Sequence, residues 1–200
     1  MRTLALGETY VRDGTADSRN LTDTGLRKLA AHAVLGELRI FEILAEFKPV
    51  LVGTVPLGID LPTSDLDIVC EVGALERFAE ILRDAYGGYS GFELSRQPLS
   101  GCPAVLASFS SQGFSIEVVG QAIPIAKQYA YRHMVVEERL LRLAGPAARE
   151  AIRALKRAGF ETEPAFAQYF KLAGDPYRVL SDLYDASADV LRRLVGDAPG

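Results

Sequence analysis

The chain has 200 residues and a mass of 21.7 kDa, and 48% of its residues are hydrophobic, which suits one globular domain with at most a small appendage. Its formal net charge of −4 and its scattered basic residues argue against long nucleic acid or an anionic membrane as a partner. No apolar run is long enough to span a membrane, and the N-terminal residues lack a secretory signal pattern. Cys70 and Cys102 are far apart in sequence, so we expect two free thiols in a cytoplasmic protein.

The first part of the chain begins with a polar stretch and continues with a helical pattern. Residues 1–22 are polar and irregular, and we expect them to form an extended arm. Residues 21–47 have polar capping residues near their start and apolar residues at helical spacing, and Pro49 ends the pattern. Residues 49–54 are typical of a short strand, and 55–64 of a loop, because two prolines and a glycine there oppose regular structure.

The rest of the chain contains strands first and helices afterwards. We expect a strand at 64–72, a helix at 73–87, and strands at 92–98, 103–112 and 113–121. From near Pro124 onward the pattern is helical, beginning with one long helix. This order predicts a mixed α/β (α+β) fold, in which a mixed β-sheet is flanked by helices and followed by a helical segment. The predicted divisions are an arm at 1–22, a core at 23–121 and a helical C-terminal segment at 122–200.

Three acidic residues occur within strand patterns that are otherwise apolar. Asp65 and Asp67 are two residues apart, so they point to the same face of a sheet. Glu117 is a single acid between Ile116 and Val118. If the two strands are neighbours, the three carboxylates converge, and their repulsion requires a compensating cation. Carboxylate oxygens suit Mg²⁺ or Mn²⁺, although an Asp-x-Asp pair also occurs in loops and edge strands without any such role.

A glycine followed by a hydroxyl residue precedes the acidic pair. Gly53 allows a backbone to approach a phosphate closely, and the hydroxyl of Thr54 can donate a hydrogen bond to it. Ten residues separate Thr54 from Asp65. The chain has only two histidines and no paired cysteines, so a zinc site is not expected.

These motifs together resemble those of a known superfamily. The stretch LVGTVPLGIDLPTSDLDIV, followed by the acid in SIEV, resembles the signature of the DNA polymerase β-like nucleotidyltransferases. Within that superfamily the chain is similar to the DUF4269 proteins, through GIDLPTSDLDI, IEVVGQ and AYRHM. The resemblance covers roughly residues 23–120 and implies a nucleotidyltransferase-like fold. Thr54 departs from the pattern, because the superfamily prefers serine or glycine there, but threonine keeps the hydroxyl.

The resemblance also implies roles for particular residues. Asp65 and Asp67 would bind the metal ions that hold a triphosphate, and Glu117 would complete the second metal site or act as a base toward the acceptor hydroxyl. Gly53 and Thr54 would contact the β- and γ-phosphates.

Several other polar residues admit two interpretations from sequence. Ser64 either contributes its hydroxyl to the active site or ends the loop before the strand. Asp60 is interpreted as a turn residue rather than a metal ligand. Arg132, with Lys127 about one turn earlier, either binds a phosphate or orients a catalytic carboxylate, or else Arg132 pairs structurally with an acid. His133 reads as a hydrogen-bonded helix residue.

The resulting functional hypothesis is metal-dependent transfer of a nucleoside monophosphate. The donor would be an NTP, and the acceptor a hydroxyl or phosphate of a small molecule or protein, with release of pyrophosphate. One alternative is a non-catalytic protein of the same fold that binds a nucleotide or, like an antitoxin, a partner protein. Another alternative is hydrolysis of a nucleotide or phosphodiester at the same metal ions.

Overall fold

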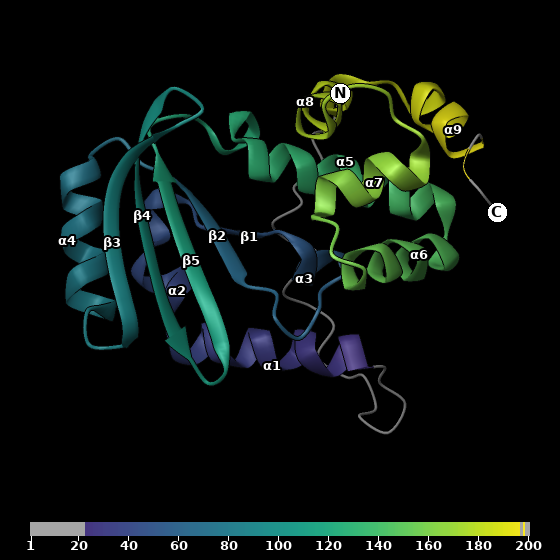
Figure 1. Ribbon diagram of the computed structural model, residues 1–200. Coiled ribbons are helices and arrows are strands. Elements are labelled where there is room, and N and C mark those ends of the chain that lie inside the picture. Colours follow the sequence, from purple (N-terminus) through teal and green to yellow (C-terminus); the bar gives the residue numbers. More distant parts are fainter. Residues whose placement is uncertain (1–22, 197, 199–200) are drawn as a thin grey trace.

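The computed structural model describes residues 23–196 and residue 198, so the predicted arm at 1–22 lies outside the described residues (Figure 1). The strands are β1 (Val50–Val52), β2 (Leu66–Glu71), β3 (Ser90–Leu99), β4 (Cys102–Ser111) and β5 (Phe114–Gln121). The helices of the core are α1 (Asp23–Glu37), α2 (Ile40–Ile43), η2 (Ala45–Phe47), α3 (Thr54–Leu57) and α4 (Leu75–Tyr86). Those that follow are η3 (Ile125–Lys127), α5 (Tyr129–Ala144), α6 (Pro146–Arg157), α7 (Thr162–Phe170), α8 (Pro176–Asp182), η4 (Leu183–Asp185) and α9 (Ala188–Gly196).

The five strands form one mixed sheet with the order β1-β2-β5-β4-β3. Strands β2 and β5 are parallel, and every other neighbouring pair is antiparallel. The helices α5 to α9 follow the last strand and lie beside the sheet (Figure 1). The predicted fold class, a mixed sheet flanked by helices with a helical C-terminal segment, is therefore confirmed.

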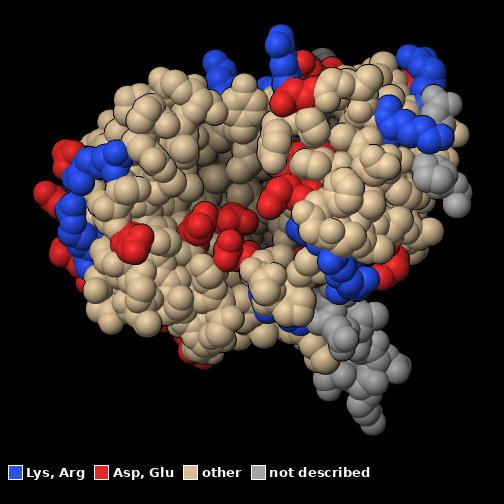
Figure 2. All heavy atoms as spheres, in the orientation of Figure 1, with Lys and Arg blue, Asp and Glu red and all other residues tan. Residues whose placement is uncertain are grey.

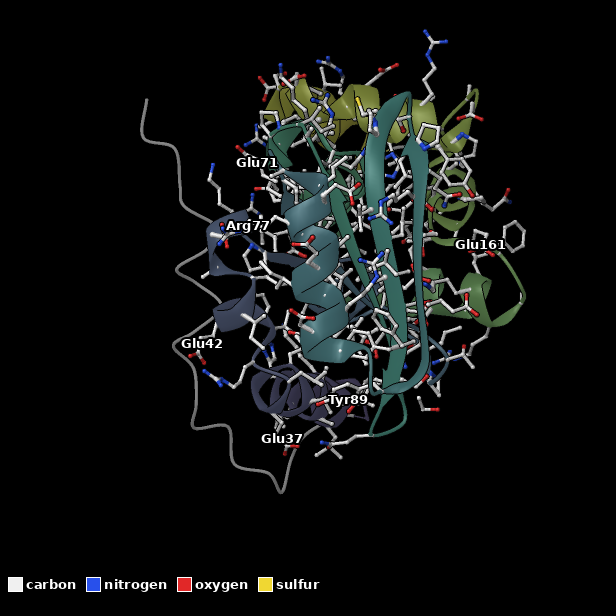
Figure 3. The ribbon with its side chains drawn as sticks, turned by 90° about the vertical axis from the view of Figure 1, so that its left-hand side faces the viewer. Glu37, Glu42, Glu71, Arg77, Tyr89 and Glu161 are labelled. Carbon is white, nitrogen blue, oxygen red and sulfur yellow. The ribbon has the colours of Figure 1, made fainter. Side chains whose placement is uncertain are left out.

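The two faces of the sheet have different surroundings. Side chains alternate along a strand, so Leu66, Ile68 and Cys70 share one face of β2, and all three are fully buried. They belong to a core cluster with Phe78 and Leu82 of α4 and with apolar residues of α1 and α2. Figure 3 shows α4 and the labelled Arg77 on one side of strands β3 and β4, and the labelled Glu161 on the other. The side chains of the other face, which we call the open face, include Asp67.

A substitution at Gly120 of β5 can test how closely α4 packs on the sheet. A Cβ at this position would lie 2.3 Å from Cε1 of Phe78 and 2.7 Å from Cγ2 of Val72. Gly120→Ala is therefore expected to lower the free energy of unfolding by about 1 to 3 kcal/mol, measured by urea denaturation. The matched control is Gly36→Ala in α1, where a Cβ meets nothing within 4 Å. The control should be neutral or slightly stabilising, and equal losses in the two variants would contradict this packing.

A second core cluster joins the helical segment to the loop after β1. Leu57, at the end of α3, and Ile59, just after it, are buried against residues of α5 to α9. These residues are Val136, Leu140, Leu141, Ala148, Ile152, Ala165, Phe166, Phe170, Leu180 and Leu191. The loop that links the glycine motif to the acidic pair is thereby fixed to the helical segment. Among the described residues no helix is both long and apolar enough to cross a bilayer, and Cys70 and Cys102 are free.

The prediction of a single helix over residues 21–47 is wrong, because the structure has three shorter helices there. α1 ends at Glu37, and Arg39 adopts a left-handed conformation with φ 52° before α2 begins. The break allows Leu38, Ile40 and Leu44 all to reach the core cluster, where each is at most 4% exposed. A continuous helix would not bring these closely spaced residues to one face as completely.

The long helix predicted from Pro124 is also interrupted. Gln128 is extended, with φ −77° and ψ 134°, and separates η3 from α5. Its buried side-chain amide donates hydrogen bonds to the carbonyl of Cys70 at 2.9 Å and to that of Ile123 at 3.2 Å. These bonds tie the start of the helical segment to β2. The buried residues of α5 are His133, Val136, Glu137, Leu140 and Leu141, so two polar residues interrupt the apolar pattern of its buried face.

Candidate active site

Strands β2 and β5 are neighbours, so the condition set by the sequence for convergence of the acids is met. In the register of the sheet, Asp67 is the partner of Glu117, Glu117 of Ser108, and Ser108 of Glu93. These four side chains form a row across the open face. Asp65 lies just before β2, and its charge acts on both Asp67 and Glu117, so it belongs to the same acidic group.

The carboxylates in this row affect one another electrostatically. Burial, and then the charges of Glu117 and Asp65, raise the pKa of Asp67 from 3.8 to about 7, while Lys156 opposes the shift. Glu117 is exposed at the surface, but partial desolvation, followed by the charge of Asp65, raises its pKa. None of the three acids belongs to an ion pair among the described residues. The site therefore concentrates negative charge, which the charge of Lys156 offsets only in part.

The carboxylate oxygens of Asp65, Asp67 and Glu117 are suitable ligands for a hard divalent cation, but they do not surround a single metal position in this structure. Across the part of the chain that the structure describes, no three acidic, histidine or cysteine side chains already form a metal-binding group. Three carboxylates on one face, without a basic partner, are the oxygen ligands that Mg²⁺ or Mn²⁺ prefers.

Gly53 lies directly beside Asp67. It follows β1, whose last residue Val52 is the register partner of Asp67. A Cβ on Gly53 would lie 2.3 Å from Oδ2 of Asp67, and the glycine has φ 79° and ψ −152°, a conformation that side chains oppose. Thr54 comes next, half-buried, and begins α3. The glycine motif and the acidic pair thus meet in space although ten residues separate Thr54 from Asp65.

The loop between the glycine motif and the acidic pair is anchored by Arg27 of α1. The Nε atom of Arg27 forms an ion pair with Oδ2 of Asp60 at 3.1 Å, and its Nη2 atom donates to the carbonyl of Ser64 at 2.8 Å. Asp60 is only 1% exposed, and burial, opposed mainly by its own backbone hydrogen bond and by Arg27, raises its pKa. The hydroxyl of Ser64 accepts a hydrogen bond from the amide of Leu61 at 2.9 Å, which favours the loop-ending role for Ser64.

Arg132 and Lys127 are not brought to the acidic row. The Nη2 atom of Arg132 donates to the carbonyl of Ser181 at 2.9 Å and to Asp185 at 3.1 Å, and its guanidinium lies 4.3 Å from the ring centre of Tyr184. These contacts hold α5 against α8 and η4, so the geometry favours structural pairing of Arg132 over phosphate binding. Lys127 is exposed in η3 and is not among the charges that shift the pKa of Asp67.

Two residues of the helical segment, absent from the sequence-based site, act on Asp67 instead. The charge of Lys156 in α6 lowers the pKa of Asp67, and that of Glu163 in α7 raises it. Lys156 is half-buried, donates to Oγ1 of Thr162 at 2.8 Å, and has a pKa lowered by burial against the opposing effect of nearby carboxylates. Lys156 belongs to an ordinary amphipathic helix pattern, so no local signal distinguishes it from a surface lysine.

Glu163 belongs to a largely buried group of polar side chains that also includes His133 and Glu137. Nδ1 of His133 is 2.9 Å from Oε1 of Glu163, and Nε2 of His133 donates to the carbonyl of Tyr177 at 2.8 Å. The expectation that His133 is a hydrogen-bonded helix residue is confirmed. Burial alone would raise the pKa of Glu163, but the bond to His133 lowers it. Glu137 is 3% exposed, and burial, with the charge of Glu163, raises its pKa to about 8.

The acidic side chains gather in a hollow of the molecular surface. Figure 2 shows a group of them between the sheet and the helical segment, with a second acidic group and neighbouring basic atoms on the facing side. We call this hollow the cleft. One wall is the open face of the sheet with Asp65, Asp67 and Glu117, and the charges of Glu163 and Lys156 act on Asp67 from the helical segment.

Residues 33–183 match the model of a family described as a domain of unknown function, DUF4269, so the chain belongs to the DUF4269 family. No curated protein matches the chain significantly.

Solved structures of nucleotidyltransferases have a similar fold. A structure of the Cid1 poly(U) polymerase with Mg 3′-dATP bound is 14% identical, has a TM-score of 0.51, and is matched over 80% of this chain and 48% of that one. Another Cid1 structure is 16% identical with a TM-score of 0.50, over 76% and 50% of the two chains. The GLD-2/RNP-8 complex is 13% identical with a TM-score of 0.49, over 86% and 76%. The chain thus spans about half the length of the Cid1 chains, and over the matched part its fold is similar to that of the Cid1 poly(U) polymerase.

Proposed function

We propose that the protein transfers a nucleoside monophosphate from an NTP to an acceptor, in a reaction that depends on a divalent metal ion. The observation that carries this proposal is the row of unneutralised carboxylates, Asp67 beside Glu117 with Asp65 two residues away, next to a glycine whose missing side chain leaves room at Asp67. A triphosphate with its metal ions supplies the charge and ligands that this arrangement lacks. The fold, which similar proteins use for nucleotidyl transfer, supports the same chemistry by analogy.

Each residue of the site has a distinct role in the proposed reaction. Asp65 and Asp67 would hold Mg²⁺ or Mn²⁺, which would neutralise the triphosphate and stabilise the leaving pyrophosphate. The backbone at Gly53 and the hydroxyl of Thr54 donate hydrogen bonds to the terminal phosphates. Lys156, whose charge acts on Asp67 from the helical segment, adds a cation toward the triphosphate.

Glu117 lies on the acceptor side of the acidic pair in this proposal. Its carboxylate accepts the proton of the acceptor hydroxyl as the oxygen attacks the α-phosphorus. The new oxygen–phosphorus bond forms while the bond from the α-phosphorus to the bridging oxygen breaks, and pyrophosphate leaves with that electron pair. The raised pKa of Glu117, which results first from partial desolvation and then from the charge of Asp65, suits a carboxylate that accepts a proton.

Calorimetric titration of each NTP with Mg²⁺ or Mn²⁺ tests this proposal. Asp65→Asn is expected to weaken metal-dependent NTP binding at least about tenfold, because it removes a charged ligand. Asp84→Asn on α4 is the matched control, since Asp84 is exposed and belongs to a helix packed on the other face of the sheet. Binding that needs no metal, or that survives Asp65→Asn in a folded variant, contradicts the proposal. Product analysis then separates nucleotidyl transfer from hydrolysis and from binding alone.

A further inference from the structure

A groove continues from Glu117 along the open face, away from the acidic pair. It has a volume of about 450 Å³ and lies over strands β3, β4 and β5. The side chains that matter here are Glu93, Ser95, Leu106, Ser108, Glu117 and Val119, all among the groove's lining residues. In the register of the sheet these residues form two adjacent rows, one with Glu93, Ser108 and Glu117 and the other with Ser95, Leu106 and Val119.

The groove presents carboxylates and hydroxyls but no cation. Of the residues that the structure describes, neither a lysine nor an arginine contributes to its lining. Arg96, which follows Ser95, points to the other face of the sheet by alternation, where it forms two bonds of 3.1 and 2.5 Å with Glu76. Glu93 is exposed, and among the described residues it has no ion pair or hydrogen-bond partner of its own. Its charge is therefore available to a bound molecule.

The position of the groove relates it to one of the two substrates. Asp65 and Asp67 lie on the side of Glu117 nearer to Gly53, where the proposed reaction places the triphosphate. The groove lies on the opposite side of Glu117, so a hydroxyl inside it faces the carboxylate that accepts its proton. Its volume falls within the usual range for sites that bind small molecules, roughly 300 to 1,000 Å³.

On the basis of the proposed function, we propose that this groove binds the acceptor, and that the acceptor is a small hydroxyl compound carrying a protonated amine. Glu93 pairs with the amine, the hydroxyls of Ser95 and Ser108 bind its polar groups, and Leu106 and Val119 contact its carbon skeleton. The amine supplies the positive charge that the groove lacks. A phosphorylated acceptor or the end of an RNA strand would instead place phosphates beside two carboxylates, which repel them.

The inference is tested by measuring how the full chain binds hydroxyl compounds that carry a positive charge, no charge or a negative charge. The probes are glucosamine, its β-1,4-linked disaccharide, glucose, glucose 6-phosphate and a short oligoribonucleotide. Each is titrated alone, and again with Mg²⁺ and a non-hydrolysable NTP. The amino sugars are expected to bind at least tenfold more tightly than glucose, with no detectable binding of the two phosphorylated probes.

Two variants attribute that preference to the groove. Glu93→Gln should remove most of the amino sugar preference while NTP binding stays unchanged, because Glu93 lies outside the proposed metal and phosphate sites. Glu80→Gln is the matched control, since Glu80 is an exposed glutamate of α4, which packs on the opposite face. Equal binding of glucose and glucosamine, tighter binding of the phosphorylated probes, or an amino sugar preference unaffected by Glu93→Gln overturns the inference.

These outcomes are distinct from failure of the proposed function. If the wild-type chain does not bind a metal–NTP complex, the proposed function fails, and the sugar titrations without nucleotide still decide whether the groove selects amines. If the metal–NTP complex binds but the sugars are not distinguished by charge, only the inference about the acceptor fails.

Discussion

Asp67→Asn is expected to stabilise the metal-free protein at pH 8 and, at the same time, to abolish metal-dependent NTP binding. Burial, together with Glu117 and Asp65, raises the pKa of Asp67 from 3.8 to about 7. Ionising this carboxyl in the folded protein is therefore unfavourable, whereas the unfolded chain ionises it freely. A neutral asparagine of the same shape avoids that cost. One pKa unit corresponds to about 1.4 kcal/mol, so the gain is on the order of 2 to 4 kcal/mol.

The pH dependence of the free energy of unfolding shows whether ionisation of Asp67 causes the stability difference between the wild type and Asp67→Asn. Between about pH 4 and pH 7, the folded wild-type chain binds more protons at Asp67 than the unfolded chain does, so its free energy of unfolding falls as the pH rises through this range. The variant lacks this decrease, and the difference between the two proteins should grow from near zero at pH 4 to its maximum above pH 7. Urea unfolding at a series of pH values in EDTA measures the difference.

Mg²⁺ provides the complementary measurement. A metal ion that binds only the folded state stabilises the wild-type chain at pH 8, and the stabilisation rises with metal concentration. Asp67→Asn should show little or none of it. Asp84→Asn serves as the control and should follow the wild type under both conditions. A variant that is less stable than the wild type in EDTA at pH 8 would mean that Asp67 is satisfied by partners other than a metal ion.

Features that depend on neighbouring residues in sequence were predicted well. The apolar neighbours of Asp67 and of Glu117 each indicate a strand, and β2 and β5 confirm both strands. The mixed sheet followed from the order of these patterns and is confirmed by the strand pairing. The parallel pairing that places Asp67 beside Glu117 is a long-range contact. From the sequence, the convergence of these acids can be predicted only on the condition that their strands are neighbours.

Features that depend on tertiary contacts were missed or misplaced. Arg132 was assigned two alternative roles, because its sequence does not reveal that Ser181 and Asp185, about fifty residues later, bind it. The sequence does not indicate Lys156 as a residue of the site, because its effect on Asp67 depends on how α6 packs across the cleft. Asp60 was interpreted as a turn residue, but its burial against Arg27 of α1 makes it an anchor for the loop. In each case the decisive partner lies more than thirty residues away in sequence.

Gly53→Ala should impair the proposed reaction much more than it impairs folding. The new Cβ would lie 2.3 Å from Oδ2 of Asp67, which is closer than nonbonded atoms can be. Since that oxygen is at the end of a side chain, the carboxylate can rotate away, and the clash is relieved at the expense of the metal ligand. The remaining cost comes from the backbone, because φ 79° with ψ −152° is strained for alanine by roughly 1 to 3 kcal/mol.

Gly58→Ala separates the effect of backbone strain from that of the clash. Gly58 also has a positive φ of 68°, but a Cβ there meets nothing within 4 Å. Its left-handed conformation should cost about 1 to 2 kcal/mol of stability and leave metal-dependent NTP binding intact. In Gly53→Ala, by contrast, NTP binding should weaken at least about tenfold, because a displaced ligand no longer meets the metal ion. If both variants bind NTP equally, the open space beside Asp67 does not serve the site, and Gly53 is required only for the turn after β1.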